Sequence, residues 1–183
     1  MEAILNNNLI WLDLEMTGLD PERMVILEIG TVVTDIHLNI LAQGPDIFIN
    51  YSEEVLSEME EWSLNHHTAS GLLDLVRASN YDCAHAERET LKFVSSYCKK
   101  GESPLCGNSI WQDRRFLARY MPELERFFHY RMIDVSSIKE LAFRWYPELP
   151  AYEKKKAHQA LSDIHESINE LKYYRERLFV DIR

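Results

Sequence analysis

Two acidic residues lie in an apolar stretch near the start of the chain, within IWLDLEMTGLD, Ile10–Asp20. Asp13 and Glu15 are two positions apart, so on a β-strand both side chains project from one face. Neighbouring carboxylates repel each other, and burying either one without a partner costs free energy. Paired hard oxygen ligands suit Mg²⁺ or Mn²⁺, so this spacing indicates a divalent metal site. The alternative is a half-exposed strand with two outward polar residues.

Two further acids and one histidine are candidates to complete such a site. Asp113 lies near the start of one expected helix, in GNSIWQDRRFL, and Asp163 near the start of the last one, in HQALSDIHES. Either acid could instead only stabilise a helix N-terminus. His158 precedes Asp163 by five positions, a rotation of about 140° on a helix, so the two cannot share a helical face. We therefore expect His158 on the loop before the helix and Asp163 on the helix itself.

The composition predicts a globular protein with one domain over residues 1–183. The chain is 46% hydrophobic and 27% charged, and no apolar run approaches membrane length. Three cysteines without metal-site spacing and an N-terminus without a basic signal region predict a cytoplasmic protein with no membrane association. The net charge of −10 argues against binding long nucleic acid, which usually needs a basic surface. A short nucleic acid held by metal ions and a few cations is compatible with this charge.

The pattern of apolar residues predicts a mixed α/β fold. The first part should form three antiparallel strands joined by short links, at residues 9–16, 25–35 and 40–50. A helix capped by Ser52 should follow. Its apolar stripe comprises Val55, Met59 and Trp62. Two further strands should then alternate with helices, which gives a mixed sheet flanked by helices. These later elements are expected at residues 86–100, 104–109, 111–121, 130–137, 137–146 and 160–179.

The acids and the histidine occur in an order that resembles a known group of nucleases. D-x-E, a distant Asp, and H-x-A-x-x-D resemble the DEDDh 3′–5′ exonucleases of the ribonuclease H-like fold. Within that group, four stretches resemble the oligoribonuclease family, and the resemblance extends over residues 9–177. These stretches are WLDLEMTGLDPE, GNSIWQDRRFL, RMIDVSSIKEL and HQALSDIHESINELKYYR.

The resemblance implies which residues carry the chemistry. The residues that would hold two divalent metal ions, Mg²⁺ or Mn²⁺, are Asp13, Glu15, Asp113 and Asp163. Two metal ions about 4 Å apart can stabilise both the attacking and the leaving oxygen of a phosphodiester displacement. His158 would accept a proton from the attacking water, since histidine titrates near neutrality.

The resemblance also implies a site for bases and phosphates. Leu19 and Trp62 would lie against a base, although Trp62 also fits the core stripe; stacking on an aromatic ring tolerates any base. His67 would contact the substrate. Ser109 and Gln112 would bond phosphate or sugar, or would only cap the helix that follows.

The stretch YRMIDVSSIKE, residues 130–140, predicts how the substrate length is fixed. Ser137 and Glu140 have capping-box spacing, and a helix N-terminus binds anions. The resemblance implies that Arg131, Ser136 and Ser137 hold a 5′-terminal phosphate. A phosphate cap at one end and metal ions at the other limit the substrate to dinucleotide length. The resemblance further implies a homodimer in which Tyr130 reaches across to the second site.

We therefore predict a two-metal 3′–5′ exoribonuclease that hydrolyses very short RNA, especially dinucleotides, to nucleoside 5′-monophosphates. An exonuclease that trims longer RNA or single-stranded DNA ends would use the same metal residues, but would have no evident use for a phosphate cap. A non-catalytic binding domain is a third possibility, and the complete set of catalytic residue types argues against it. The basic run Lys154–Lys156 either attracts the substrate backbone toward His158 or is a solvated loop.

Overall fold

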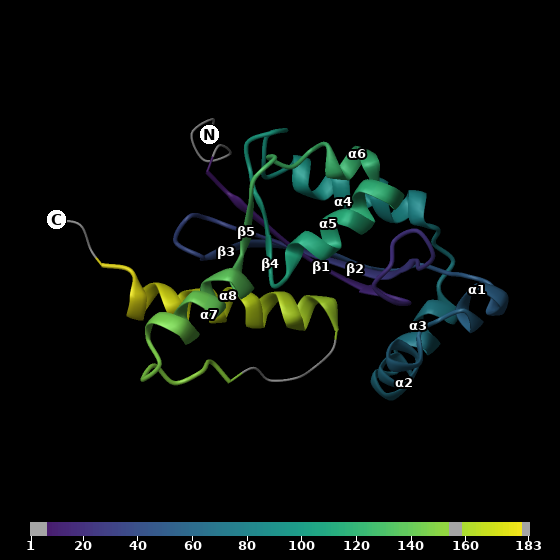
Figure 1. Cartoon of the computed structure of the whole chain (residues 1–183). Coiled ribbons are helices and arrows are strands. Elements are labelled where there is room, and N and C mark those ends of the chain that lie inside the picture. The colour runs from purple at the N-terminus through teal and green to yellow at the C-terminus, as the bar shows by residue number, and fades with distance from the viewer. Residues whose placement is uncertain (1–6, 154–158, 181–183) are drawn as a thin grey trace.

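A five-stranded mixed sheet forms the centre of the computed structural model, which describes residues 7–153 and 159–180 (Figure 1). The strand order is β3-β2-β1-β4-β5. As the sequence predicted, the first three strands pair antiparallel: β1 (Leu9–Met16), β2 (Ile26–Thr34) and β3 (Ile40–Phe48). The short strands β4 (Leu105–Gly107) and β5 (Met132–Asp134) run parallel to β1.

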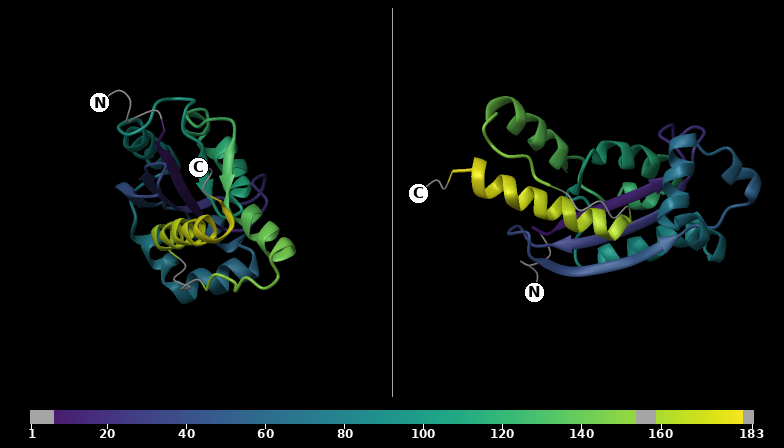
Figure 2. Two further views of the ribbon diagram at one scale, coloured as in Figure 1. Left: turned by 90° about the vertical axis from the view of Figure 1, so that its left-hand side faces the viewer. Right: turned by 90° about the horizontal axis from the view of Figure 1, so that it is seen from below.

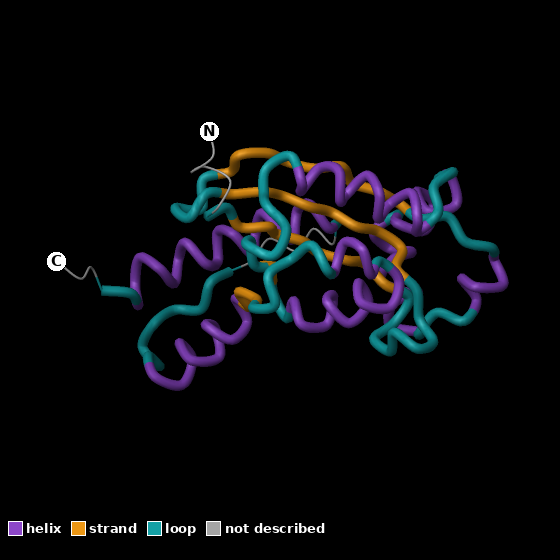
Figure 3. Tube along the Cα trace, turned by 90° about the horizontal axis from the view of Figure 1, so that it is seen from above, coloured by secondary structure: helices purple, strands orange, loops and turns teal. Residues whose placement is uncertain are grey.

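Helices cover both faces of the sheet (Figures 1 and 3). On one face lie α4 (Cys83–Ser95), α5 (Ile110–Tyr120) and α6 (Pro122–Glu125). On the other face α8 (Ala160–Leu178) runs along the strands, with α7 (Val135–Trp145) beside it (Figure 2). Three short helices lie at one end of the sheet: α1 (Glu53–Ser57), α2 (Glu61–Ser70) and α3 (Leu72–Ala78). No helix of the described ranges combines the length and apolar character that crossing a bilayer requires.

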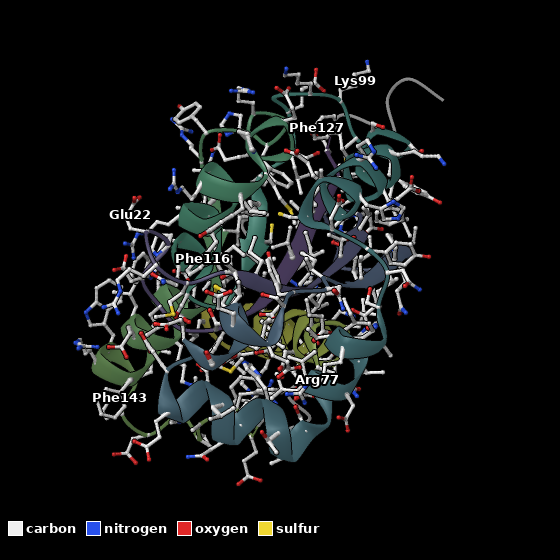
Figure 4. All side chains as sticks on the ribbon, turned by 90° about the vertical axis from the view of Figure 1, so that its right-hand side faces the viewer. Glu22, Arg77, Lys99, Phe116, Phe127 and Phe143 are labelled. Carbon is white, nitrogen blue, oxygen red and sulfur yellow. The ribbon has the colours of Figure 1, made fainter. Side chains whose placement is uncertain are left out.

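Strand β1 is central, and its two faces have different roles. Leu12 and Leu14 pack into the core that includes Phe116 of α5, which lies inside the molecule in Figure 4. Trp11, on the opposite face, is fully buried against α8 with Ile164. The face that carries the two acids of β1 is therefore packed against α8. Asp13 and Glu15 are half-buried there, so they face the start of α8 rather than open solvent.

The region after β3 differs from the sequence-based prediction. Ser52 does cap a helix, because its side chain accepts a hydrogen bond from Val55 N. That helix ends at Ser57, and the chain turns so that Glu60 N–H donates to the carbonyl of Thr17 (2.9 Å). Trp62 therefore lies on a separate helix, α2, which does not continue α1. Its side chain is 72% exposed and is not part of a core stripe. Helices α3 and α6 were not expected.

Two expected helix caps are also wrong. Helix α7 begins after Asp134, whose side chain accepts a hydrogen bond from Ser136 N (2.9 Å), so Ser137 lies in the first turn and is not the cap. Ser109 directly precedes α5, but its φ of 50° is left-handed and its side chain makes no capping hydrogen bond. Gln112 lies inside α5. The backbone at these positions is therefore held by other groups than the sequence suggested.

Candidate active site

The acids of β1 meet the first turn of α8. Asp13 pairs across the sheet with Gly30 of β2. The start of α8 lies so close to Gly30 that a β-carbon there would come within 3.0 Å of Ala160 Cβ. This close packing brings Asp163, in the first turn of α8, to the two acids. One carboxylate oxygen from each of Asp13, Glu15 and Asp163 lies within 4.8 Å of the others.

A buried carboxyl group on β2 also holds the start of α8. Glu28 is fully buried, and its Oε1 accepts a hydrogen bond from the backbone N–H of Ala160 (3.1 Å). Burial, with a smaller effect of the Asp46 carboxylate, raises the pKa of Glu28 to about 9. Glu28 is therefore protonated near neutrality and adds no charge to the acids beside it. His158, two positions before Ala160, lies outside the described residues, as do Lys154–Lys156.

Asp113 lies beside this cluster rather than within it. The residue is 5% exposed on α5, and its Oδ1 accepts a hydrogen bond from the backbone N–H of Leu14 (3.0 Å). Leu14 lies between Asp13 and Glu15, so the bond ties α5 to the acidic part of β1. The structure thus brings three of the four predicted acids together and places the fourth next to them.

The acids raise the pKa values of one another. Burial, followed by the charges of Asp113, Glu15 and Asp163, raises the pKa of Asp13 well above its ordinary value. Burial and the charge of Asp163 raise the pKa of Glu15 to about 7, and burial raises the pKa of Asp113 to about 8. Ionising all of these groups together costs free energy, which a divalent cation offsets. A set of carboxylate oxygens alone suits Mg²⁺ or Mn²⁺ rather than a softer metal, so the residues fit such ions.

A pocket of about 330 Å³ opens beside Glu15. Its lining comprises Glu15, Met16, Gly18, Leu19, Glu60, Trp62, Ser63 and His67. Leu19 and Trp62 are 64% and 72% exposed and line this pocket. The indole of Trp62 stacks on the imidazole of His66, with ring centroids 4.8 Å apart. An exposed, braced aromatic ring next to acids is suited to stacking on a nucleobase.

Two predicted substrate contacts support the backbone around this pocket. His67 is 1% exposed, and its Nε2 lies 2.9 Å from the carbonyl oxygen of Met16. Its Nδ1 lies 3.8 Å from Glu15 Oε2, and burial lowers the pKa of His67. Gln112 is 8% exposed and donates from Nε2 to the carbonyl of Leu19. Both side chains thus fix the loop after β1, and a direct contact with substrate stays a prediction for each.

A second, open pocket of about 420 Å³ lies at the start of α7. It is lined by Ser109, Trp111, Asp134, Ser136, Ser137, Glu140 and Leu141. The structure thus brings three predicted phosphate-binding serines together, and Ser136 Oγ accepts a hydrogen bond from Ser109 N–H (3.0 Å). Arg131 is exposed, with its guanidinium carbon 5.2 Å from the ring centroid of Tyr130, which is itself 71% exposed.

Sequence reasoning missed two residues that hold this site. Glu28 was detectable as an acid in the apolar strand stretch MVILEIG, the same signal that singled out Asp13. Asn108 follows β4 and bonds to residues of both α7 and α8. Nothing in the local sequence marks Asn108, because its partners lie 28 and 59 positions away.

Comparisons with known proteins agree with this geometry. Residues 10–171 match the RNase_T exonuclease family. The chain is 57% identical to the oligoribonuclease of Dichelobacter nodosus over 175 residues, which cover 96% of this chain and 97% of that protein. It is 58% identical to the oligoribonuclease of Escherichia coli K12 over 171 residues, which cover 93% and 94% of the two chains.

Solved structures show the same fold at low sequence identity. E. coli exonuclease I in complex with a dT13 oligonucleotide superposes with a TM-score of 0.73 at 15% identity. The match covers 93% of this chain and 41% of exonuclease I, so the chain spans about two-fifths of that larger protein. The fold is therefore ribonuclease H-like, and the family match, the acids and the relatives agree: the chain belongs to the oligoribonuclease family of 3′–5′ exoribonucleases.

Proposed function

We propose that this protein is a two-metal exoribonuclease that hydrolyses very short RNA, especially dinucleotides, to nucleoside 5′-monophosphates. The convergence of Asp13, Glu15 and Asp163 beside the pocket of Leu19 and Trp62 carries this proposal. This arrangement places a candidate site for divalent cations next to a surface on which a nucleobase can stack. The high identity to proteins named oligoribonuclease supports RNA as the substrate class.

The proposed mechanism assigns each group one task. Asp13, Glu15, Asp113 and Asp163 would hold two divalent ions, which when bound stabilise the attacking and leaving oxygens of the phosphodiester. His158 accepts the proton of the attacking water, since histidine titrates near neutrality. Leu19 and Trp62 hold the 3′-terminal base by stacking, worth about 1–3 kcal/mol per base and tolerant of sequence. His67 and Gln112 keep the loop of Leu19 in place.

The second pocket would bind the other end of the substrate. In this proposal Arg131, Ser136 and Ser137 hold the 5′-phosphate at the first turn of α7. Ser109, Ser136 and Ser137 line the pocket, whereas Arg131 is not among its lining residues and would reach the phosphate from the start of β5. A pocket for one end and acids for the other favour dinucleotides over longer RNA. The net charge of −10 supports this, because a long RNA would need a basic surface. An exonuclease that trims longer ends is the competing function.

We further propose a homodimer in which Tyr130 reaches the partner's site. Several large apolar side chains of the α7 region are exposed: Leu141, Phe143, Trp145, Tyr146 and Phe179. Phe143, 77% exposed, points outward in Figure 4, and an apolar patch of this kind usually marks an interface. Sedimentation at assay concentration tests this proposal, and a fully active monomer would contradict it.

The chain is also proposed to be a single domain in the cytoplasm. Cys83, Cys98 and Cys106 all lie in the described ranges, and none of them forms a disulfide there. Unpaired cysteines fit a reducing compartment.

A time course on RNAs of different length tests the proposed function. We expect a 5′-phosphorylated dinucleotide to be hydrolysed at least about tenfold faster, in kcat/KM, than a 5′-phosphorylated heptanucleotide, because only the short substrate fills both pockets. Removing the 5′-phosphate of the dinucleotide should remove most of this advantage. Equal rates at all lengths would favour the trimming exonuclease, and no hydrolysis with either Mg²⁺ or Mn²⁺ would favour a binding domain.

A further inference from the structure

A chain of hydrogen bonds connects the first turn of α7 to the acid-bearing turn of α8. Asn108, directly after β4, is its central residue. Its Oδ1 accepts a hydrogen bond from Ser136 Oγ (3.1 Å), and its Nδ2 donates to Ser167 Oγ (2.7 Å). Ser167 Oγ in turn donates to the backbone carbonyl of Asp163 (2.8 Å). Three successive hydrogen bonds therefore join the pocket at α7 to a residue of the acidic cluster.

The hydrogen bonds of Asn108 fix the orientation of its side-chain amide. Asn108 also donates from Nδ2 to Glu170 Oε2 (3.1 Å), so both its amide N–H groups and its carbonyl oxygen have partners. Ser167 and Glu170 are 5% and 0% exposed, and Lys139 Nζ lies 3.9 Å from Glu170 Oε1. Buried polar networks that satisfy their central group are rigid, because an unpaired polar atom there is costly. Asn108 therefore adds a polar link between α7 and α8 to their direct apolar packing, in which Val135 and Ala142 cluster with Ile164.

We propose that Asn108 is a positioning residue that fixes the separation between the phosphate pocket at α7 and Asp163, and thereby sets the preferred substrate length. This inference rests on the proposed function, in which the two ends of a dinucleotide bind at these two places. A displacement of about 1 Å between binding site and reacting atoms can lower a rate about 100-fold. A dinucleotide bound at both ends would feel such a displacement. A substrate that does not reach the pocket at α7 would not be affected by this displacement.

Asn108→Asp and a partner substitution test the inference. The aspartate keeps an acceptor for Ser136 but turns a carboxylate oxygen toward Glu170, which breaks the link to α8 and leaves the link to α7. We expect the preference for the 5′-phosphorylated dinucleotide over the heptanucleotide, in kcat/KM, to fall about tenfold. Adding Glu170→Gln removes the opposition of two carboxylates and places an amide donor opposite the new acceptor. It should restore part of the preference, because the bond to Ser167 stays lost. The p-nitrophenyl ester of thymidine 5′-monophosphate, which reaches the acids and the base pocket but not the pocket at α7, should be hydrolysed within about twofold of wild type.

Two further variants keep the test decisive. Ser167→Ala removes the link to Asp163 without adding charge, and serves if Asn108→Asp does not fold; it should lower the same preference. Asn8→Ala is the matched control, because Asn8 is also buried, 4% exposed, and donates from Nδ2 to the carbonyl of Tyr97 (2.8 Å) away from both pockets. It should leave the preference unchanged.

The outcomes separate this inference from the proposed function. Folded Asn108→Asp and Ser167→Ala variants with the wild-type length preference would overturn the positioning role alone. Equal losses on the dinucleotide, the heptanucleotide and the p-nitrophenyl ester would also overturn it, because Asn108 would then support the acids and not the length. A wild-type enzyme that shows no preference for the dinucleotide would overturn the proposed function, and the inference with it.

Discussion

Replacing Asp13 with asparagine is expected to abolish hydrolysis while making the metal-free protein more stable. Asp13 lies at the centre of the acidic cluster, and the charges of Asp113, Glu15 and Asp163 all raise its pKa. An amide is a weaker ligand for Mg²⁺ than a carboxylate, so turnover of a dinucleotide should fall at least about 10³-fold. Ionising Asp13 in the folded protein costs free energy that an asparagine does not, so the substitution should raise the free energy of unfolding at pH 8 without metal.

The same cluster predicts how stability depends on pH. Unfolded carboxyl groups titrate near pH 4, whereas in the folded protein the pKa of Glu15 is about 7 and that of Asp113 about 8. In that interval the folded state holds protons that the unfolded state has released, so stability falls as the pH rises from about 4 to about 8. Thermal unfolding in EDTA should therefore give a higher Tm at pH 5 than at pH 8. Mn²⁺ should raise the Tm most at pH 8, where protons compete least for the ligands.

A distant acid provides the control for both measurements. Asp74→Asn changes an exposed residue of α3, whose carboxylate lies 3.9 Å from Arg77, and should shift unfolding by less than about 0.5 kcal/mol. It should also leave hydrolysis unchanged. The assignment of Asp13 as a metal ligand is refuted if Asp13→Asn hydrolyses the dinucleotide at the wild-type rate. A variant less stable than wild type in EDTA at pH 8 would contradict the repulsion argument.

The parts of the site set by local periodicity could be predicted from the sequence. Asp13 and Glu15 share a face because strand side chains alternate, and Asp163 lies in the first turn of a helix that begins at its expected residue, Ala160. The order of acids and histidine then identified the family, which the relatives confirm. These features depend on neighbours in the sequence or on whole-chain similarity.

The parts that depend on distant partners could not be predicted. The helix after Ser52 ends early because Glu60 bonds to Thr17, 43 positions earlier, and this is why Trp62 faces solvent instead of the core. Capping-box spacing predicted Ser137 as the cap of α7, and the bond from Ser136 N to the Asp134 side chain shows that the helix begins earlier. Local helix propensity carries no information about these contacts between distant residues.

Replacing His158 with alanine is expected to lower hydrolysis by about 10²–10⁴-fold without weakening Mn²⁺ binding, because general-base catalysis contributes that much and no carboxylate is removed. In the sequence His158 is two positions before Ala160, the first residue of α8, and Glu28 and the close approach at Gly30 hold this start of α8 against β2. Calorimetric titration with Mn²⁺ and single-turnover hydrolysis of a dinucleotide measure the two effects separately. In the wild type, kcat/KM should rise with pH through the histidine pKa, near 6.5 in model peptides, and the variant should lose that rise.

A histidine inside α8 separates a general base from a merely structural residue. His165 of α8 lies with Nε2 3.1 Å from Gln43 Oε1, so His165→Ala removes an imidazole seven positions further along the chain without removing any of the acids. It should change kcat/KM by less than about twofold and keep the pH dependence. Added imidazole should restore part of the activity of His158→Ala, because a free base can occupy the vacated space, and should have no effect on His165→Ala. If His158→Ala instead loses Mn²⁺ affinity in proportion to its activity, the histidine supports the metal site and the proton acceptor must be another group.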